Sequence, residues 1–195
     1  MSLKNSRTTS DYMEWNMMLS LIRKLYKDGD YRMSLFIGCG AFFGLRVSDL
    51  LKLKWKTLLE DDKFVITEQK TSKRRVIKIN SDFQSHIRKC FEALRIKDME
   101  EPCFLSRKKV VYSIQRLNVK LKEIKAKYKL KIENFSSHSL RKTFGRKVYE
   151  SSGEKAEIAL IRLSELFNHS SVAITKVYLG IRQDELLETY DMLDF

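Results

Sequence analysis

Five side chains that lie far apart in this sequence have the types needed to act together on a phosphodiester. They are Arg46 in the segment GLRVSDL, His138 and Arg141 in HSLR, His169 in NHSS, and Tyr178 nine residues further on. The planar guanidinium of arginine can bind two phosphate oxygens at once. A phenol oxygen can attack phosphorus when its proton is drawn away or nearby cations stabilise the phenolate. The set therefore predicts a site that stabilises the charge developing during phosphoryl transfer.

Each of these residues also has an ordinary structural interpretation. One arginine among 38 basic residues is usually a surface ion-pair partner, a lone histidine usually belongs to the core or caps a helix, and one of eight tyrosines is usually half-buried. Arg46 differs because it directly follows Gly44 and Leu45 after an apolar segment, where a solvated face is not expected. His138 and Arg141 are spaced i, i+3 and would share one helix face, near N–H groups that favour an anion.

The hydrophobic pattern predicts a mainly helical protein with one small antiparallel β-sheet, an α+β fold. Two short β-branched runs at 64–67 and 75–79 flank a polar turn and predict a strand pair, to which 55–59 could add a third strand. The almost wholly apolar segment 31–43 is expected as a helix at the centre of the core. Apolar spacing and capping residues indicate helices at 10–27, 31–43, 82–96, 113–128, 139–150, 156–167, 173–179 and 184–193.

The order and spacing of the motifs resemble the catalytic domain of the tyrosine recombinases, the phage integrase family. GLRVSDL is similar to the family's first arginine motif, HSLR to its His-x-x-Arg motif, and LFNHSSVAITKVYLG to the segment that runs from a histidine to the nucleophilic tyrosine. The resemblance covers roughly residues 10–195 and leaves no counterpart for the family's N-terminal DNA-binding domain. One departure is Phe167-Asn168-His169, where the family often has Leu-Gly-His. The resemblance implies that Tyr178 forms a covalent 3′-phosphotyrosyl intermediate and that the other catalytic residues are Arg46, His138, Arg141 and His169.

The same resemblance implies a catalytic lysine in the predicted turn between the two strands. Lys70, immediately before Thr71, is its counterpart and would protonate the leaving 5′-hydroxyl. Lys73 is three residues away and remains the alternative, and a lysine in a turn can also simply be solvated. Asp49, one helical turn after Arg46, either orients that arginine or is an ordinary exposed acid.

The composition favours a protein that binds nucleic acid. The 195 residues include 38 Lys and Arg against 25 Asp and Glu, a formal net charge of +13, which predicts a polyanionic partner such as double-stranded DNA. The basic runs at 107–109 and 120–131 are candidate phosphate contacts or solvated helix faces. Cys39, Cys90 and Cys103 lack metal-ligand spacing, so we expect reduced core thiols and no metal or other cofactor.

The sequence favours a cytoplasmic protein without a membrane partner. No apolar run approaches the roughly 20 residues that a bilayer span requires, and the polar N-terminus does not resemble a signal peptide. His86, on a polar helix, is interpreted as structural. Residues 1–9 are expected as a flexible tail or a cloning remnant, 10–181 as the catalytic domain and 182–195 as a C-terminal helix.

These observations predict a site-specific recombinase or integrase of a phage or other mobile element, independent of metal and ATP. A tyrosine-dependent topoisomerase and a non-catalytic DNA-binding regulator are the alternatives. The resemblance also implies a homotetramer on paired sites as the active form, and a monomer is one expectation for the isolated chain. The predicted last helix carries an apolar stripe that either folds back on its own domain or docks on a neighbouring protomer, formed by Leu186, Leu187, Tyr190 and Leu193.

Overall fold

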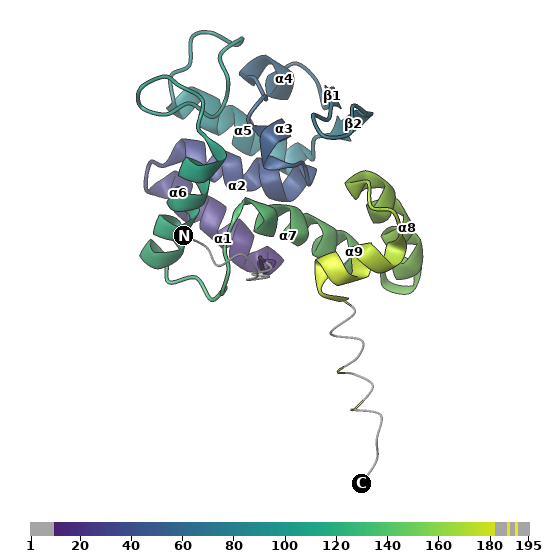
Figure 1. The fold of residues 1–195 in the computed structure, drawn as a ribbon. Coiled ribbons are helices and arrows are strands. Elements are labelled where there is room, and N and C mark those ends of the chain that lie inside the picture. Colours follow the sequence, from purple (N-terminus) through teal and green to yellow (C-terminus); the bar gives the residue numbers. More distant parts are fainter. Residues whose placement is uncertain (1–9, 182–186, 188–189, 191–195) are drawn as a thin grey trace. The chain divides into compact units, whose positions relative to one another are not determined.

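The computed structural model describes residues 10–181, 187 and 190, and the chain divides into two compact units between Phe144 and Gly145. Unit 1 contains α1 (Trp15–Lys27), α2 (Tyr31–Phe43), α3 (Val47–Leu50), α4 (Trp55–Leu59), β1 (Lys63–Thr67), β2 (Arg74–Lys78), α5 (Ser81–Ala93), α6 (Ile114–Lys127) and the start of α7 (Ser137–Glu150) (Figure 1). Unit 2 contains the rest of α7, the 3-10 turn η1 (Gly153–Lys155), α8 (Ala156–Phe167) and α9 (Val172–Leu179). The predicted mainly helical α+β fold is confirmed.

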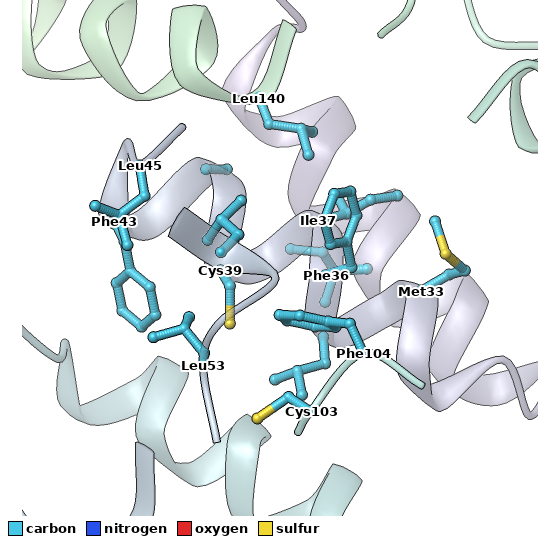
Figure 2. Packing of buried hydrophobic residues seen from close by; sticks show 14 of the residues in the cluster. Met33, Phe36, Ile37, Cys39, Phe43, Leu45, Leu53, Cys103, Phe104 and Leu140 are labelled. Carbon is cyan, nitrogen blue, oxygen red and sulfur yellow. The ribbon is translucent and has the colours of Figure 1, made fainter. Parts of the chain in front are cut away.

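Helix α2 forms the centre of the core of unit 1, as its composition predicts. Every residue from Met33 to Ala41 is buried, because the helix packs against α1, α3 and α5 on different sides (Figure 1). Its Phe36 ring meets Phe104 edge to face, with the ring centres 5.3 Å apart. Figure 2 shows these side chains converging with Leu140 of α7 in one hydrophobic cluster. The cluster gives the ends of α2 and the start of α7 a rigid support.

The three cysteines lie inside this core as unpaired, buried thiols, which confirms the predicted core position. Burial raises the pKa of all three thiols, that of Cys90 to about 12. The thiols are therefore neutral and unreactive at physiological pH. His86 is also structural, as predicted, because its Nε2 lies 3.0 Å from the buried Ser34 hydroxyl.

The predicted strand pair is confirmed, but the predicted third strand is wrong. Strands β1 and β2 pair antiparallel with Val65 opposite Val76, and the turn that joins them carries Lys70. Residues 55–59 instead form helix α4. The reason is that Trp55 and Leu58 are both buried, and a spacing of three residues puts two side chains on one face of a helix.

The first helix begins at Trp15 rather than at the predicted Ser10. The residues before it are bound to distant parts of the chain instead of to one another. The Met13 N–H donates to Thr143 Oγ1 over 2.8 Å, and the same hydroxyl donates to Met13 O. The Asp11 N–H likewise donates to Asn134 O. These bonds hold the segment as an extended strap along residues 134–143.

The other predicted helices in the described residues begin and end within a few residues of their expected limits. The predicted tail 1–9 and the predicted helix 184–193 lie outside the described residues, apart from Leu187 and Tyr190, which are both exposed. Among the helices that the structure describes, each is too short or too polar to cross a bilayer.

Candidate active site

Arg46 lies at the junction between the central helix α2 and the short helix α3. Helix α2 ends at Gly44, whose φ of 57° is left-handed and where a Cβ would collide with the Phe144 ring. The chain therefore turns sharply, and Arg46 becomes the residue that precedes α3. Its Nη1 donates to Glu68 Oε2 over 2.7 Å, while 21% of the side chain stays exposed. Arg46 is thus fixed by a carboxylate and still reaches the surface.

Arg141 is buried on α7 and is directed at the same junction. Its Nη1 donates to Gly44 O over 2.6 Å, and Arg75 Nη2 donates to the neighbouring Phe43 O over 2.9 Å. Arg141 and Arg75 therefore both bind carbonyl groups at the C-terminal end of α2, where the helix dipole favours positive charge. The structure brings the two predicted arginines, Arg46 and Arg141, to one place around Gly44.

Sequence reasoning missed two members of this cluster, Glu68 and Arg75. Glu68 is 3% exposed, and its Oε1 lies 3.6 Å from Arg75 Nη1. Burial raises the pKa of the Glu68 carboxyl, but hydrogen bonds from Thr71 and Arg46 and the charges of Arg46 and Arg141 outweigh it, so the pKa lies below its ordinary value. The only signal in the sequence is one acidic residue within a basic hairpin, which is more typical of a solvated position.

The turn that carries Lys70 is held to α3 by Asp49. The Gln69 N–H donates to Asp49 Oδ1 over 2.8 Å, and Asp49 is fully buried. The interpretation of Asp49 as an exposed acid is therefore wrong, whereas its influence on Arg46 stays a prediction. Lys70 and Lys73 are both exposed in or beside the turn. Since both residues are exposed at the surface, the assignment of Lys70 rather than Lys73 as the proton donor also stays a prediction.

His138 stands in the first turn of α7, as predicted. The helix begins at Ser137, and the His138 N–H donates to the Ser136 hydroxyl over 3.3 Å. His138 is an exposed residue, yet surrounding atoms partly desolvate its ring. This desolvation, followed by the charges of Arg141 and Lys142, lowers the pKa of His138 below its ordinary value. The imidazole is therefore neutral near pH 7 and can accept a proton or donate a hydrogen bond.

The two remaining site residues, His169 and Tyr178, lie together in unit 2. Their ring centres are 5.1 Å apart at an angle of 70°, and Phe167 packs against the tyrosine ring at 5.5 Å. His169 Nδ1 lies 3.0 Å from the hydroxyl of Thr175, a buried residue of α9. Because that hydroxyl also faces Ser171 O as a donor, the pair favours a proton on Nδ1 of the imidazole.

The turn before His169 explains why asparagine can stand at its start. Helix α8 ends at Asn168, whose φ of 53° is left-handed. Glycine adopts this conformation without strain, and asparagine tolerates it better than most residues. The Ser171 side chain then accepts from the Ile174 N–H and begins α9. The departure from Leu-Gly-His therefore keeps the backbone turn that presents His169.

The described residues contain no group of three or more His, Cys, Asp or Glu side chains arranged to hold a metal ion. Arg46, His138, Arg141 and the Lys70 turn belong to unit 1, and His169 and Tyr178 belong to unit 2.

Solved structures with the same fold are recombinases and integrases. The chain is similar to the XerA recombinase, with a TM-score of 0.71, 20% identity, and coverage of 94% of this chain and 66% of that one. It is also similar to the Tn1549 transposon integrase in complex with transposon right end DNA, with a TM-score of 0.70, 15% identity and coverage of 95% and 68%. A XerH complex with its difH substrate gives a TM-score of 0.68, 19% identity and coverage of 96% and 55%. The fold is that of the tyrosine recombinase catalytic domain.

Sequence comparison identifies the family. Residues 12–185 match the phage integrase family. The probable integrase/recombinase YoeC of Bacillus subtilis (strain 168) is 34% identical over 165 residues, 83% of this chain and 82% of that protein. The tyrosine recombinase XerC of Xanthomonas axonopodis pv. citri (strain 306) is 26% identical over 148 residues, and the match spans 76% of this chain but 46% of XerC. The chain belongs to the phage integrase family, which places it among the site-specific recombinases and confirms the predicted family.

Proposed function

We propose that this recombinase cleaves and rejoins double-stranded DNA through a covalent 3′-phosphotyrosyl intermediate, with Tyr178 as the nucleophile. The observation that carries the proposal is the arginine cluster at Gly44, where Arg46 is held by a hydrogen bond to Glu68 and Arg141 by a hydrogen bond to Gly44 O. Such a cluster suits a phosphodiester because its donors are already oriented before the substrate binds. The 3′ polarity is taken from the family resemblance.

The proposed reaction conserves the energy of the phosphodiester. The Tyr178 oxygen bonds to phosphorus and loses its proton to a histidine, His138 or His169. The bond from phosphorus to the 5′-oxygen breaks, and that oxygen takes a proton from Lys70. Arg46 and Arg141 stabilise the additional charge on the non-bridging oxygens. Rejoining is the reverse attack by a 5′-hydroxyl, so the balance requires neither ATP nor a metal ion.

We propose double-stranded DNA as the partner and a homotetramer on paired sites as the active assembly. The net charge of +13 supports the first part, as do the relatives whose structures hold DNA. Removal of residues 184–195 tests whether this segment takes part in the assembly or belongs to the core of its own chain. Lys70 is preferred to Lys73 because it matches the position of the family's catalytic lysine.

A nicked suicide substrate tests the proposed function. A pool of nicked duplexes with randomised flanks is incubated with the protein, and covalent adducts are enriched under denaturing conditions. We expect the protein to be joined to the 3′ end of the upstream strand fragment, an adduct that a non-catalytic DNA-binding regulator cannot form. Relaxation of supercoiled plasmid without a paired site would instead indicate a topoisomerase.

Binding to duplex DNA is expected to weaken steeply with salt. Each phosphate that the protein neutralises contributes about −0.9 to the slope of log K against log salt, because condensed counterions are released. The exposed basic run 107–109 is a candidate for such contacts. Fluorescence anisotropy with a labelled duplex at several salt concentrations measures the slope. An affinity that does not change with salt would contradict an electrostatic interface.

The cleavage rate is expected to rise with pH through the lowered pKa of His138. Below that pKa the ring gains a proton, which adds charge beside Arg141 and Lys142 and removes the proton-accepting nitrogen. The lowered pKa of His138 also affects the stability of the fold, because the folded state disfavours the protonated imidazole. The stability contribution is therefore present above the pKa of the unfolded state and is lost as the pH falls through the pKa of the folded state. Single-turnover cleavage between about pH 5 and about pH 8 measures the acid limb. His138→Gln should flatten this limb, and an identical limb in the variant would assign it to another group.

A further inference from the structure

Glu68 connects two parts of the candidate site that belong to different elements. Its Oε2 accepts a hydrogen bond from Arg46 Nη1 over 2.7 Å and a second from Thr71 Oγ1 over 3.0 Å. Arg46 precedes α3, whereas Thr71 follows Lys70 in the turn between β1 and β2. A single carboxylate oxygen therefore binds both the arginine and the turn with the proposed proton donor.

The backbone of the turn is fixed around the same carboxylate residue. The Glu68 N–H donates to Lys73 O over 3.0 Å, and the Ser72 N–H donates to Glu68 O over 2.9 Å. Together with the bond from Gln69 N–H to Asp49, these contacts bind the residues on both sides of Lys70. The backbone of Lys70 is therefore held on both sides although its side chain is exposed.

The charges of the cluster show why a buried carboxylate is needed there. The positive charge of Arg141 lowers the pKa of Glu68. At Arg75, the positive charge of Arg46 lowers the pKa of the guanidinium, whereas the negative charge of Asp49 raises it. Three arginines and two carboxylates leave one formal positive charge, which a phosphodiester with one negative charge would balance. Without the charge of Glu68, Arg46 and Arg75 would repel each other in a poorly solvated place.

We propose that Glu68 is a positioning residue that sets Arg46 and the Lys70 turn at a fixed separation. Phosphate binding and protonation of the leaving oxygen are then available in the same geometry. The inference rests on the proposed function, because it assigns Glu68 a role in that reaction. A rival role, in which the carboxylate competes with the phosphate for Arg46, predicts that removing its charge accelerates cleavage.

Two variants separate the two contacts of Glu68. Glu68→Gln keeps the size of the side chain but removes the charge that holds Arg46. Thr71→Val removes the hydroxyl that ties the turn to Glu68, together with the longer bond of 3.4 Å that this hydroxyl accepts from the Lys73 N–H, and it leaves the charge of Glu68 in place. It therefore remains informative even if Glu68→Gln fails to fold. Matched controls are Glu60→Gln, whose side chain is 58% exposed, and Thr67→Val, an exposed residue at the end of β1.

The readout compares leaving groups that differ in their need for a proton. The full chain is tested on a nicked duplex with the ordinary 5′-oxygen and on one with a bridging 5′-sulfur, since a thiol is far more acidic than an alcohol and leaves without protonation. We expect Thr71→Val to lower cleavage of the oxygen substrate on the order of tenfold and to leave the sulfur substrate near the wild-type rate. Glu68→Gln should slow both substrates, because Arg46 also loses its partner.

The possible outcomes keep this inference apart from the proposed function. If the wild-type chain forms no adduct with either substrate, the proposed function fails. If the wild type forms adducts and Thr71→Val loses both substrates equally, or loses neither, the positioning role of Glu68 is overturned. Faster cleavage by Glu68→Gln would overturn it in favour of the competing role. Thermal melting and duplex binding of each variant show whether a loss is one of folding or affinity. Such a loss in Thr71→Val would also overturn the positioning role, whereas a folding failure of Glu68→Gln leaves Thr71→Val to decide.

Discussion

Tyr178→Phe is expected to abolish the covalent protein–DNA adduct while leaving the fold and DNA binding intact. The substitution removes the attacking oxygen and nothing else. The aromatic contacts of the ring with His169 at 5.1 Å and Phe167 at 5.5 Å remain available to phenylalanine. Adduct formation on a labelled suicide substrate should therefore fall to background, while thermal melting and duplex binding stay near the wild-type values.

The matched control for this substitution is Tyr149→Phe, which removes a hydroxyl from the last turn of α7. It should form the adduct at the wild-type level. Proteolysis of the wild-type adduct followed by mass spectrometry identifies the attachment site directly. Attachment to Tyr149 or Tyr190 instead of Tyr178 would contradict the assignment of the nucleophile.

Loss of either arginine of the cluster should have the second largest effect. Arg46→Ala or Arg141→Ala is expected to cost about 3 kcal/mol of transition-state stabilisation, roughly a hundredfold in the cleavage rate. Binding should weaken much less, because most of the 38 Lys and Arg residues remain available to contact a duplex. Single-turnover cleavage at saturating DNA measures the first effect, and anisotropy measures the second.

The two arginine variants differ in their expected effect on stability. Arg141 is buried and donates to Gly44 O, so Arg141→Ala should also destabilise unit 1 by about 1–3 kcal/mol through the unsatisfied carbonyl. Arg141→Lys retains the charge and separates this loss from the lost guanidinium geometry. Arg116→Ala is the control, because its ion pair with Glu123 is exposed. Wild-type cleavage by both Arg46→Ala and Arg141→Ala would place the phosphate-binding site elsewhere.

Local sequence patterns predicted the elements that are long enough to show a regular apolar period or that are apolar throughout. Helix α2 is apolar on all sides because it is surrounded, and the sequence therefore reveals both its type and its place. The five residues of α4 are too few to separate a helical from an alternating pattern, so they were wrongly assigned to a strand. The segment before Trp15 carries a helical pattern, but its hydrogen-bond partners at Asn134 and Thr143 are invisible to any local rule.

The same distinction applies to the candidate site. Arg46, His138 and Arg141 could be predicted because their neighbours in the sequence form motifs of fixed spacing. Glu68 could not, because nothing near it in the sequence indicates that it would be buried. Its environment is created by arginines from β2, α7 and the α2–α3 junction, which meet only in the folded chain.

The strap formed by residues 10–14 has a consequence for biosynthesis. Met13 bonds to a residue 130 positions later, and Asp11 bonds to one 123 positions later. A ribosome makes α7 last among the helices of unit 1, so the strap waits without its partners until Thr143 has left the exit tunnel. The same helix delivers Arg141 to Gly44. Contacts of such long sequence separation form late. A nascent chain therefore completes its arginine cluster only when it closes unit 1, and shorter products of interrupted translation lack this cluster.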